Sequence, residues 1–166
     1  MELISYIVFA FLLVVRVSGT CLDGFEHHGT QCYKIAALEA SWMEAKMYCR
    51  LLGSELAVID DATEESTVEG MLTKLHGSHI DEDYWISGTD IINENDWRWM
   101  TSDGTSIPFN YTHWGAGKPD NLGGNENCLV IHFRKGRTSW NDNVCNALHS
   151  FICETRYYTE TGEIVG

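Results

Sequence analysis

The spacing of apolar and polar positions predicts two amphipathic helices. Residues 41–52 place apolar side chains on one helical face, and Ser41 with Glu44 forms a capping-box pattern at the start. Residues 63–75 repeat apolar positions at 68, 71, 72 and 75, which is also helical spacing. Gly53 and Gly77 follow as stop signals, because glycine commonly ends a helix.

Short apolar segments bounded by polar residues predict strands. These segments are residues 55–60, 84–87, 97–100, 128–133 and 151–154. Residues 103–127 have little periodicity and many Gly and Asn residues. A segment of that length in a compact domain is usually functional, and we expect a bound ion or a disulfide to hold it.

The first 19 residues read as a signal peptide. Residues 3–15 are apolar but shorter than the roughly 20 residues needed to cross a bilayer, and small residues follow at Ser18 and Gly19. An uncleaved anchor or a buried helix is the alternative. Residues 20–156 then form one domain and residues 157–166 a polar tail, so we expect a secreted, extracellular protein without membrane insertion.

Composition excludes some partners. The chain has 166 residues, with 11 Lys and Arg against 24 Asp and Glu, for a formal net charge of −13. Nucleic-acid binding depends on Lys and Arg patches, so it is not expected here. The six cysteines all follow the proposed signal peptide, and secretion predicts three disulfides with fifteen possible pairings.

A group of oxygen donors follows the aperiodic segment. These donors are Asp120, Glu126, Asn141 and Asp142. Their side-chain oxygens are hard ligands, and calcium binds about six to eight such oxygens. The chain has no EF-hand loop, zinc-protease motif, nucleophile elbow or phosphate-binding loop. The carboxylates are therefore better explained as ion ligands than as an acid/base pair, and we do not expect an enzyme.

In their order along the chain, these features resemble the C-type lectin-like domain family over almost all of residues 20–156. The features are the cysteine pattern, the two helices, Tyr84-Trp85-Ile86-Ser87-Gly88, Lys118-Pro119-Asp120, Glu126-Asn127-Cys128 and Trp140-Asn141-Asp142. The resemblance implies an α+β fold of two helices and two small antiparallel sheets, with a long calcium-binding loop. It also implies the disulfides Cys21–Cys32, Cys49–Cys153 and Cys128–Cys145, and a cis bond before Pro119.

The resemblance further implies a function. Asp120, Glu126, Asn141 and Asp142 match the family's principal Ca²⁺ ligands, and two sugar hydroxyls would complete the ion's shell. Asp90, Glu94, Asn121 and Asn127 match a second ion site that part of the family has. The implied activity is calcium-dependent binding of glycans, in innate recognition or agglutination of microbial surfaces. A single weak sugar site usually acts together with other copies, which raises the overall avidity. A homo-oligomer is one way to bring several sites together, although the sequence has no coiled-coil stalk.

Lys118 departs from the family pattern, which has Glu-Pro-Asn for mannose-type sugars or Gln-Pro-Asp for galactose-type sugars. A charged lysine cannot ligate calcium. Asp120 favours galactose over mannose, with Trp114 as a candidate ring for stacking on the sugar, whereas Lys118 could instead favour an acidic or sulfated sugar. The alternative is a lectin-like domain that binds protein or other surfaces without calcium or sugar. Asn110 starts a glycosylation sequon close to the loop.

Overall fold

The computed structural model describes residues 21–156. The proposed signal peptide, residues 1–19, and the tail, residues 157–166, lie outside the described residues. Within residues 21–156, neither helix has the length and apolar character needed to cross a membrane.

Two helices and nine strands make up the domain. The helices are α1 (Trp42–Leu51) and α2 (Ala62–His76), with a short 3-10 turn η1 (Leu122–Gly124). The strands are β1 (Glu26–His28), β2 (Gln31–Ala40), β3 (Glu55–Leu56), β4 (Asp81–Thr89), β5 (Arg98–Met100), β6 (Ser106–Pro108), β7 (Glu126–Arg134), β8 (Arg137–Val144) and β9 (His149–Arg156). The predicted fold class is confirmed.

The first helix begins at the predicted capping box, and the second begins one residue before its predicted start. The Glu44 carboxylate accepts hydrogen bonds from the backbone N–H and the hydroxyl of Ser41, at 2.9 and 2.6 Å, which completes the capping box. Asp61 caps α2 by accepting from the backbone N–H groups of Thr63 and Glu64. Gly77 follows α2 with a φ of 67°, a conformation that glycine adopts without strain.

Two antiparallel groups of strands are joined into one sheet. One group contains β1, β2, β9 and β3, and the other contains β4, β7, β8, β5 and β6. A parallel pairing of β4 with β9, at Tyr84↔Ser150 and Trp85↔Phe151, connects the groups. The two small sheets that the sequence predicts are therefore continuous through this pairing.

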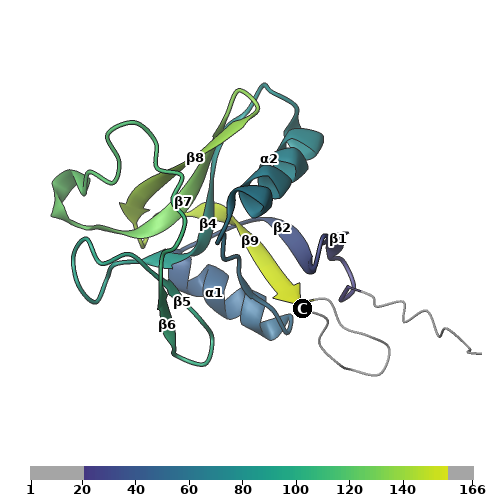
Figure 1. Ribbon diagram of the computed structural model, residues 1–166, viewed down its shortest axis with the longest axis horizontal. Coiled ribbons are helices and arrows are strands. Elements are labelled where there is room, and N and C mark those ends of the chain that lie inside the picture. The colour runs from purple at the N-terminus through teal and green to yellow at the C-terminus, as the bar shows by residue number, and fades with distance from the viewer. Residues whose placement is uncertain (1–20, 157–166) are drawn as a thin grey trace, which may run out of the picture.

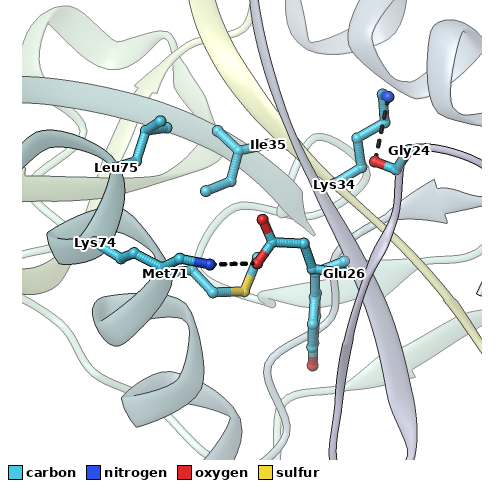
Figure 2. Close-up of a pocket in the computed structure, with 8 residues that line it drawn as sticks. Gly24, Glu26, Lys34, Ile35, Met71, Lys74 and Leu75 are labelled. Atoms are coloured by element: carbon cyan, nitrogen blue, oxygen red, sulfur yellow. Dashed lines mark hydrogen bonds and ion pairs between the residues drawn. The ribbon is translucent and has the colours of Figure 1, made fainter.

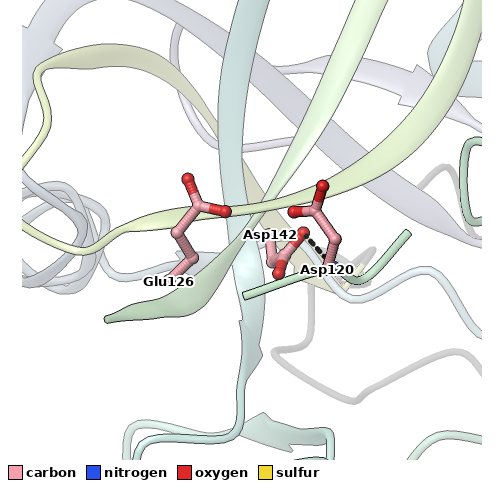
Figure 3. Close-up of side chains that lie close together, drawn as sticks. All are labelled: Asp120, Glu126 and Asp142. Carbon is pink, nitrogen blue, oxygen red and sulfur yellow. Dashed lines mark hydrogen bonds between the residues drawn. The ribbon is translucent and has the colours of Figure 1, made fainter. Parts of the chain in front are cut away.

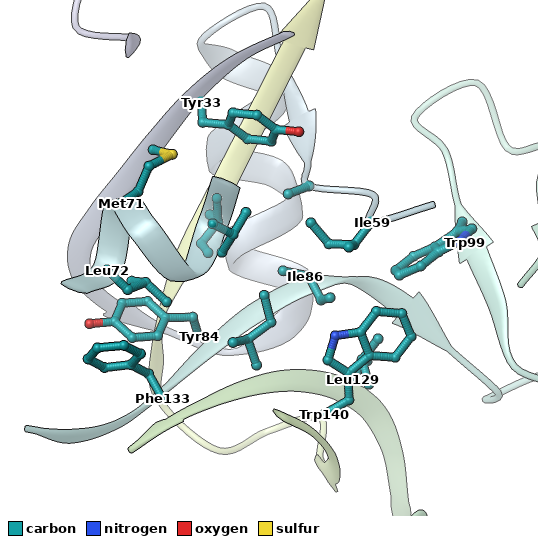
Figure 4. Packing of buried hydrophobic residues seen from close by; sticks show 14 residues of the cluster. Tyr33, Ile59, Met71, Leu72, Tyr84, Ile86, Trp99, Leu129, Phe133 and Trp140 are labelled. Atoms are coloured by element: carbon teal, nitrogen blue, oxygen red, sulfur yellow. The ribbon is translucent and has the colours of Figure 1, made fainter. Parts of the chain in front are cut away.

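The core has two clusters: one packs α2 against the strands (Figure 4), and the other packs α1 against them. Trp85, Trp99 and Trp140 are fully buried in this core. Buried indole N–H groups need an acceptor. Trp42 donates to the carbonyl of Ile86 at 2.9 Å, and Trp85 donates to the carbonyl of Ala40 at 2.8 Å. These bonds fix α1 and the end of β2 against β4.

The three implied disulfides are all present. They join Cys21 to Cys32, Cys49 to Cys153 and Cys128 to Cys145. The first bond closes the β1–β2 hairpin region, and the second ties α1 to β9. The third joins the start of β7 to the residue just after β8, which is where the candidate ligands lie.

Candidate functional site

The long loop between β6 and β7 lies on the opposite side of the molecule from β1 and the C-terminal end of β9 (Figure 1). Glu126 is the first residue of β7, Asp142 lies in β8, and Asp120 lies in the long loop between β6 and β7. The peptide bond between Lys118 and Pro119 is cis, as the resemblance implies. Within the aperiodic segment the structure adds the short β6 and η1.

Three carboxylates meet in one place. Ligand oxygens of Asp120, Glu126 and Asp142 all lie within 4.8 Å of one another. Figure 3 shows the Glu126 and Asp120 carboxylates turned toward each other beside Asp142. Asp142 is fully buried, whereas Asp120 is exposed. The group therefore opens to solvent on the Asp120 side.

Backbone donors of the loop hold this group in place. Asp142 accepts from the N–H groups of Asp120 and Asn121, the first at 3.2 Å. Glu126 accepts from the N–H of Leu122 at 3.0 Å, and its own N–H donates to the side-chain oxygen of Asn121 at 3.0 Å. Asn121 adopts a φ of 43°, a left-handed conformation that Asn tolerates better than most residues. The ligands thus also organise the loop that carries them.

Lys118 takes part in the same group. Its ammonium donates to Oδ1 of Asp120 at 2.9 Å, and the side chain is 27% exposed. This bond lowers the pKa of Asp120. Burial alone would lower the pKa of Lys118, but the bond to Asp120 and the charges of Asp120, Asp142 and Glu126 raise it. Burial and the charge of Asp142 raise the pKa of Glu126.

The donor set fits a hard divalent cation. Besides the three carboxylates, Asn141 lies next to Asp142 on β8, and its buried Oδ1 has no hydrogen-bond partner among the described residues. A buried acceptor without a partner is costly unless another group, such as an ion, uses it. Carboxylate and amide oxygens are the ligands that calcium prefers. All four residues predicted for the principal ion site therefore have suitable ligand atoms. The carboxylate oxygens of three of them, Asp120, Glu126 and Asp142, lie within 4.8 Å of one another.

The second predicted ion site is only partly assembled. Asp90 is buried, its Oδ2 accepts from the N–H of Asn95 at 2.8 Å, and its Oδ1 has no partner among the described residues. The N–H of Asp90 donates to the carbonyl of Asn127. However, the side-chain oxygen of Asn121 already accepts from Glu126, and Glu94 is exposed. This second site stays a prediction.

Trp114, in the loop between β6 and β7, belongs to an aromatic cluster. Its ring lies 5.0 Å from Trp97, 6.4 Å from Phe109 and 5.8 Å from Trp140, measured between centroids. The residue is half-buried, so the packing accounts for part of its surface. Its predicted contact with a sugar stays a prediction. Asn110 is exposed in the same loop, and its use as a glycosylation site likewise stays a prediction.

Glu65 of α2 holds the strand next to the site in place, and no local sequence pattern predicted this role. It is 5% exposed, and its Oε2 accepts from the indole N–H of Trp140 at 2.8 Å. Trp140 directly precedes Asn141, so this bond fixes the strand that carries two candidate ligands. The two residues lie 75 positions apart, and no short motif could have paired them.

A cavity of about 300 Å³ lies elsewhere, between β2 and α2 (Figure 2). The ion pair of Lys74 with Glu26, at 3.1 Å, lies among its lining residues, together with Met71 and Leu75. The residues that line it include one carboxylate and no histidine. It is therefore separate from the carboxylate group in both position and chemistry.

The geometry and the sequence place the chain in a known family. The lectin C-type domain family matches residues 38–155, which is most of the chain. The protein therefore belongs to the lectin C-type domain family.

Individual relatives cover most of the chain. It is 37% identical over 134 residues to perlucin of Haliotis laevigata, covering 81% of this chain and 82% of that one. It is 32% identical over 138 residues to the galactose-specific lectin nattectin of Thalassophryne nattereri, covering 83% and 82%.

Solved structures agree with these relatives. The carbohydrate-recognition domain of the mouse scavenger receptor C-type lectin superposes with a TM-score of 0.69 at 28% identity, covering 88% of this chain and 100% of that one. A calcium-independent type II antifreeze protein superposes with a TM-score of 0.69 at 25% identity, covering 84% and 97%.

Proposed function

We propose that this protein binds carbohydrate through a calcium ion held by Asp120, Glu126, Asn141 and Asp142. The observation that carries the proposal is the meeting of three carboxylates from the loop, β7 and β8, with ligand atoms within 4.8 Å of one another. Like charges at this distance repel, and a divalent cation removes that repulsion.

Calcium, when bound, would supply coordination positions for two neighbouring sugar hydroxyls, because protein oxygens alone do not fill its six to eight places. The carboxylates of Asp120 and Glu126 would accept hydrogen bonds from the same hydroxyls. The amide of Asn141 has both an acceptor and donors, so it suits both the ion and a sugar oxygen. Asp142 is buried, so it would ligate the ion on the side away from solvent while it keeps its hydrogen bonds to the loop backbone.

The finer assignment is a secreted lectin for galactose-type sugars, acting in recognition or agglutination of microbial glycans. Asp120 in the Lys-Pro-Asp tripeptide supports galactose over mannose, and one relative is named as a galactose-specific lectin. Three disulfides among the described residues support an oxidising compartment. A weak single site would act through several copies on one surface.

Retention on galactose-coated beads tests this function. The protein should be retained in the presence of calcium and released by EDTA. Mannose-coated beads provide the matched comparison for sugar type. Retention that EDTA leaves unchanged would contradict the mechanism.

A second candidate function is binding to protein or another surface without calcium. The observation that favours it is the Lys118–Asp120 ion pair at 2.9 Å, in which a built-in cation uses one oxygen of a candidate ligand. One structural neighbour is described as a calcium-independent antifreeze protein, which supports this alternative. This candidate predicts no change in melting temperature with calcium and no effect of Asp142→Ala on binding.

A further inference from the structure

Lys118 places a positive charge at the edge of the candidate sugar site. Its ammonium lies 2.9 Å from Oδ1 of Asp120. An ammonium has three N–H donors, and Asp120 uses one of them. The side chain is 27% exposed, so the remaining donors can be reached from solvent.

The charge balance of the site changes with this residue. The carboxylates of Asp120, Glu126 and Asp142 with the ammonium of Lys118 carry a combined charge of −2. A divalent ion would bring these groups to neutrality. A neutral or amide residue at position 118 would leave them with one negative charge, which repels an anionic ligand.

Asp120 links the ion and the ammonium. A carboxylate has two oxygens, so one can ligate an ion while the other keeps the bond to Lys118. A sugar hydroxyl held next to Asp120 therefore brings its ring substituents within reach of the Lys118 ammonium. A sulfate or carboxylate on the ring would pair with the two donors that Asp120 does not use.

Resting on the proposed function, we infer that the preferred ligands are anionic sugars, with Lys118 as the residue that selects the sulfate or carboxylate group. The remainder of the surface is acidic, with a net charge of −13 for the chain. Selectivity for an anion therefore has to come from a local contact rather than from the field of the whole protein. Lys118 supplies this contact, because its side chain forms an ion pair with Asp120 of the three-carboxylate group.

The test compares four probes in calcium: galactose, 3-O-sulfated galactose, 6-O-sulfated galactose and galacturonic acid, titrated by NMR of the ¹⁵N-labelled protein. At least one anionic probe should bind about three- to tenfold tighter than galactose, as expected for a partly exposed charge-assisted hydrogen bond. The two sulfated sugars and the uronic acid identify which anionic group and position fit. Chemical-shift changes of the loop amides should accompany the tighter binding.

Lys118→Gln should reduce the ratio of anionic to neutral affinity to about one, and Lys118→Arg should keep it. Lys74→Gln is the matched control, because it removes an exposed lysine of α2 that pairs with Glu26. Calcium affinity of each variant is measured separately, so that loss of the ion is not mistaken for loss of selectivity.

The outcomes separate the two proposals. Calcium-dependent binding of galactose with equal affinity for all four probes would overturn the inference and leave the proposed function intact. A sulfate preference that persists in Lys118→Gln would overturn the role of Lys118. Absence of binding to every probe in calcium would overturn both.

Discussion

The ammonium of Lys118 lies 2.9 Å from Oδ1 of Asp120, inside the group of residues that we assign to calcium. The side chain therefore acts as a cation already present at the site. Two consequences follow from this position: the ammonium reduces the repulsion among the carboxylates without a metal, and its positive charge opposes a metal ion bound to the other oxygen of Asp120.

Lys118→Gln should raise the affinity for calcium by about three- to tenfold. The substitution removes a positive charge next to the ion and releases Oδ1 of Asp120. Isothermal titration calorimetry with CaCl₂ measures the change, with Lys74→Gln as the control. An unchanged or weaker affinity would show that the ammonium does not oppose the ion.

Asp142→Asn should weaken calcium binding by at least about tenfold, because it removes the buried negative charge among the candidate ligands. Asn has nearly the same shape and keeps one of the two acceptor oxygens that the N–H groups of Asp120 and Asn121 use. The increase in melting temperature on adding calcium should disappear in this variant. Asp81→Asn, which alters an exposed carboxylate of β4, should keep the full increase. Equal increases in both variants would rule out Asp142 as a ligand.

Trp140→Phe should lower the free energy of unfolding by about 2–4 kcal/mol, because Glu65 loses its indole donor while it stays buried. Urea unfolding in EDTA measures this without a contribution from calcium. Adding Glu65→Gln to Trp140→Phe should recover part of the loss, since an uncharged amide costs less to bury. A double-mutant cycle with no coupling between these positions would contradict the assigned bond.

Glu154 gives stability a specific dependence on pH. Burial raises its pKa to about 8, and the nearby charges of Glu64, Asp60 and Glu55 add to the rise, against the bond from the N–H of Val58. The unfolded chain has a pKa of about 4.3 for Glu, so the folded state holds an extra proton between the two values. The stability contributed by this proton is complete below about pH 4.3 and is lost as pH rises through 8.

Thermal unfolding of Glu154→Gln at pH 6 and pH 9 tests this assignment. The melting temperature of the wild type should fall more between these pH values than that of the variant. Glu39→Gln removes an exposed carboxylate of β2 and should follow the wild type. Parallel curves for the wild type and Glu154→Gln would show that this proton is not taken up on folding.

The sequence predicted the helices well because their signals are local. Ser41 and Glu44 lie within one helical turn, and the apolar positions of α1 repeat within ten residues. The strand expected at residues 55–60 was too long, since only Glu55 and Leu56 form β3. Beyond Leu56 one backbone bond to β9 remains, from Ala57 to the carbonyl of Ile152, and the apolar pattern continues because Ala57 and Ile59 are buried.

The polar strands were harder to predict. β8 contains Trp140, Asn141 and Asp142 among polar neighbours. Because these residues are mostly polar, the segment lacks the apolar pattern that predicts a strand. The resemblance predicted all three disulfides, and it placed Asp120, Glu126 and Asp142 in one group, as the structure does. The bond of Lys118 to Asp120 depends on the folded path of the loop. The sequence left open whether this ammonium faces the ion or the solvent.

A crystal structure grown with calcium and a galactose-containing disaccharide tests the central claim most directly. It should contain one ion bound by oxygens of Asp120, Glu126, Asn141 and Asp142 at about 2.3–2.6 Å, with two sugar hydroxyls in the same coordination shell. A well-ordered site in which the Lys118 ammonium takes the place of the ion, with no sugar bound, would contradict the claim.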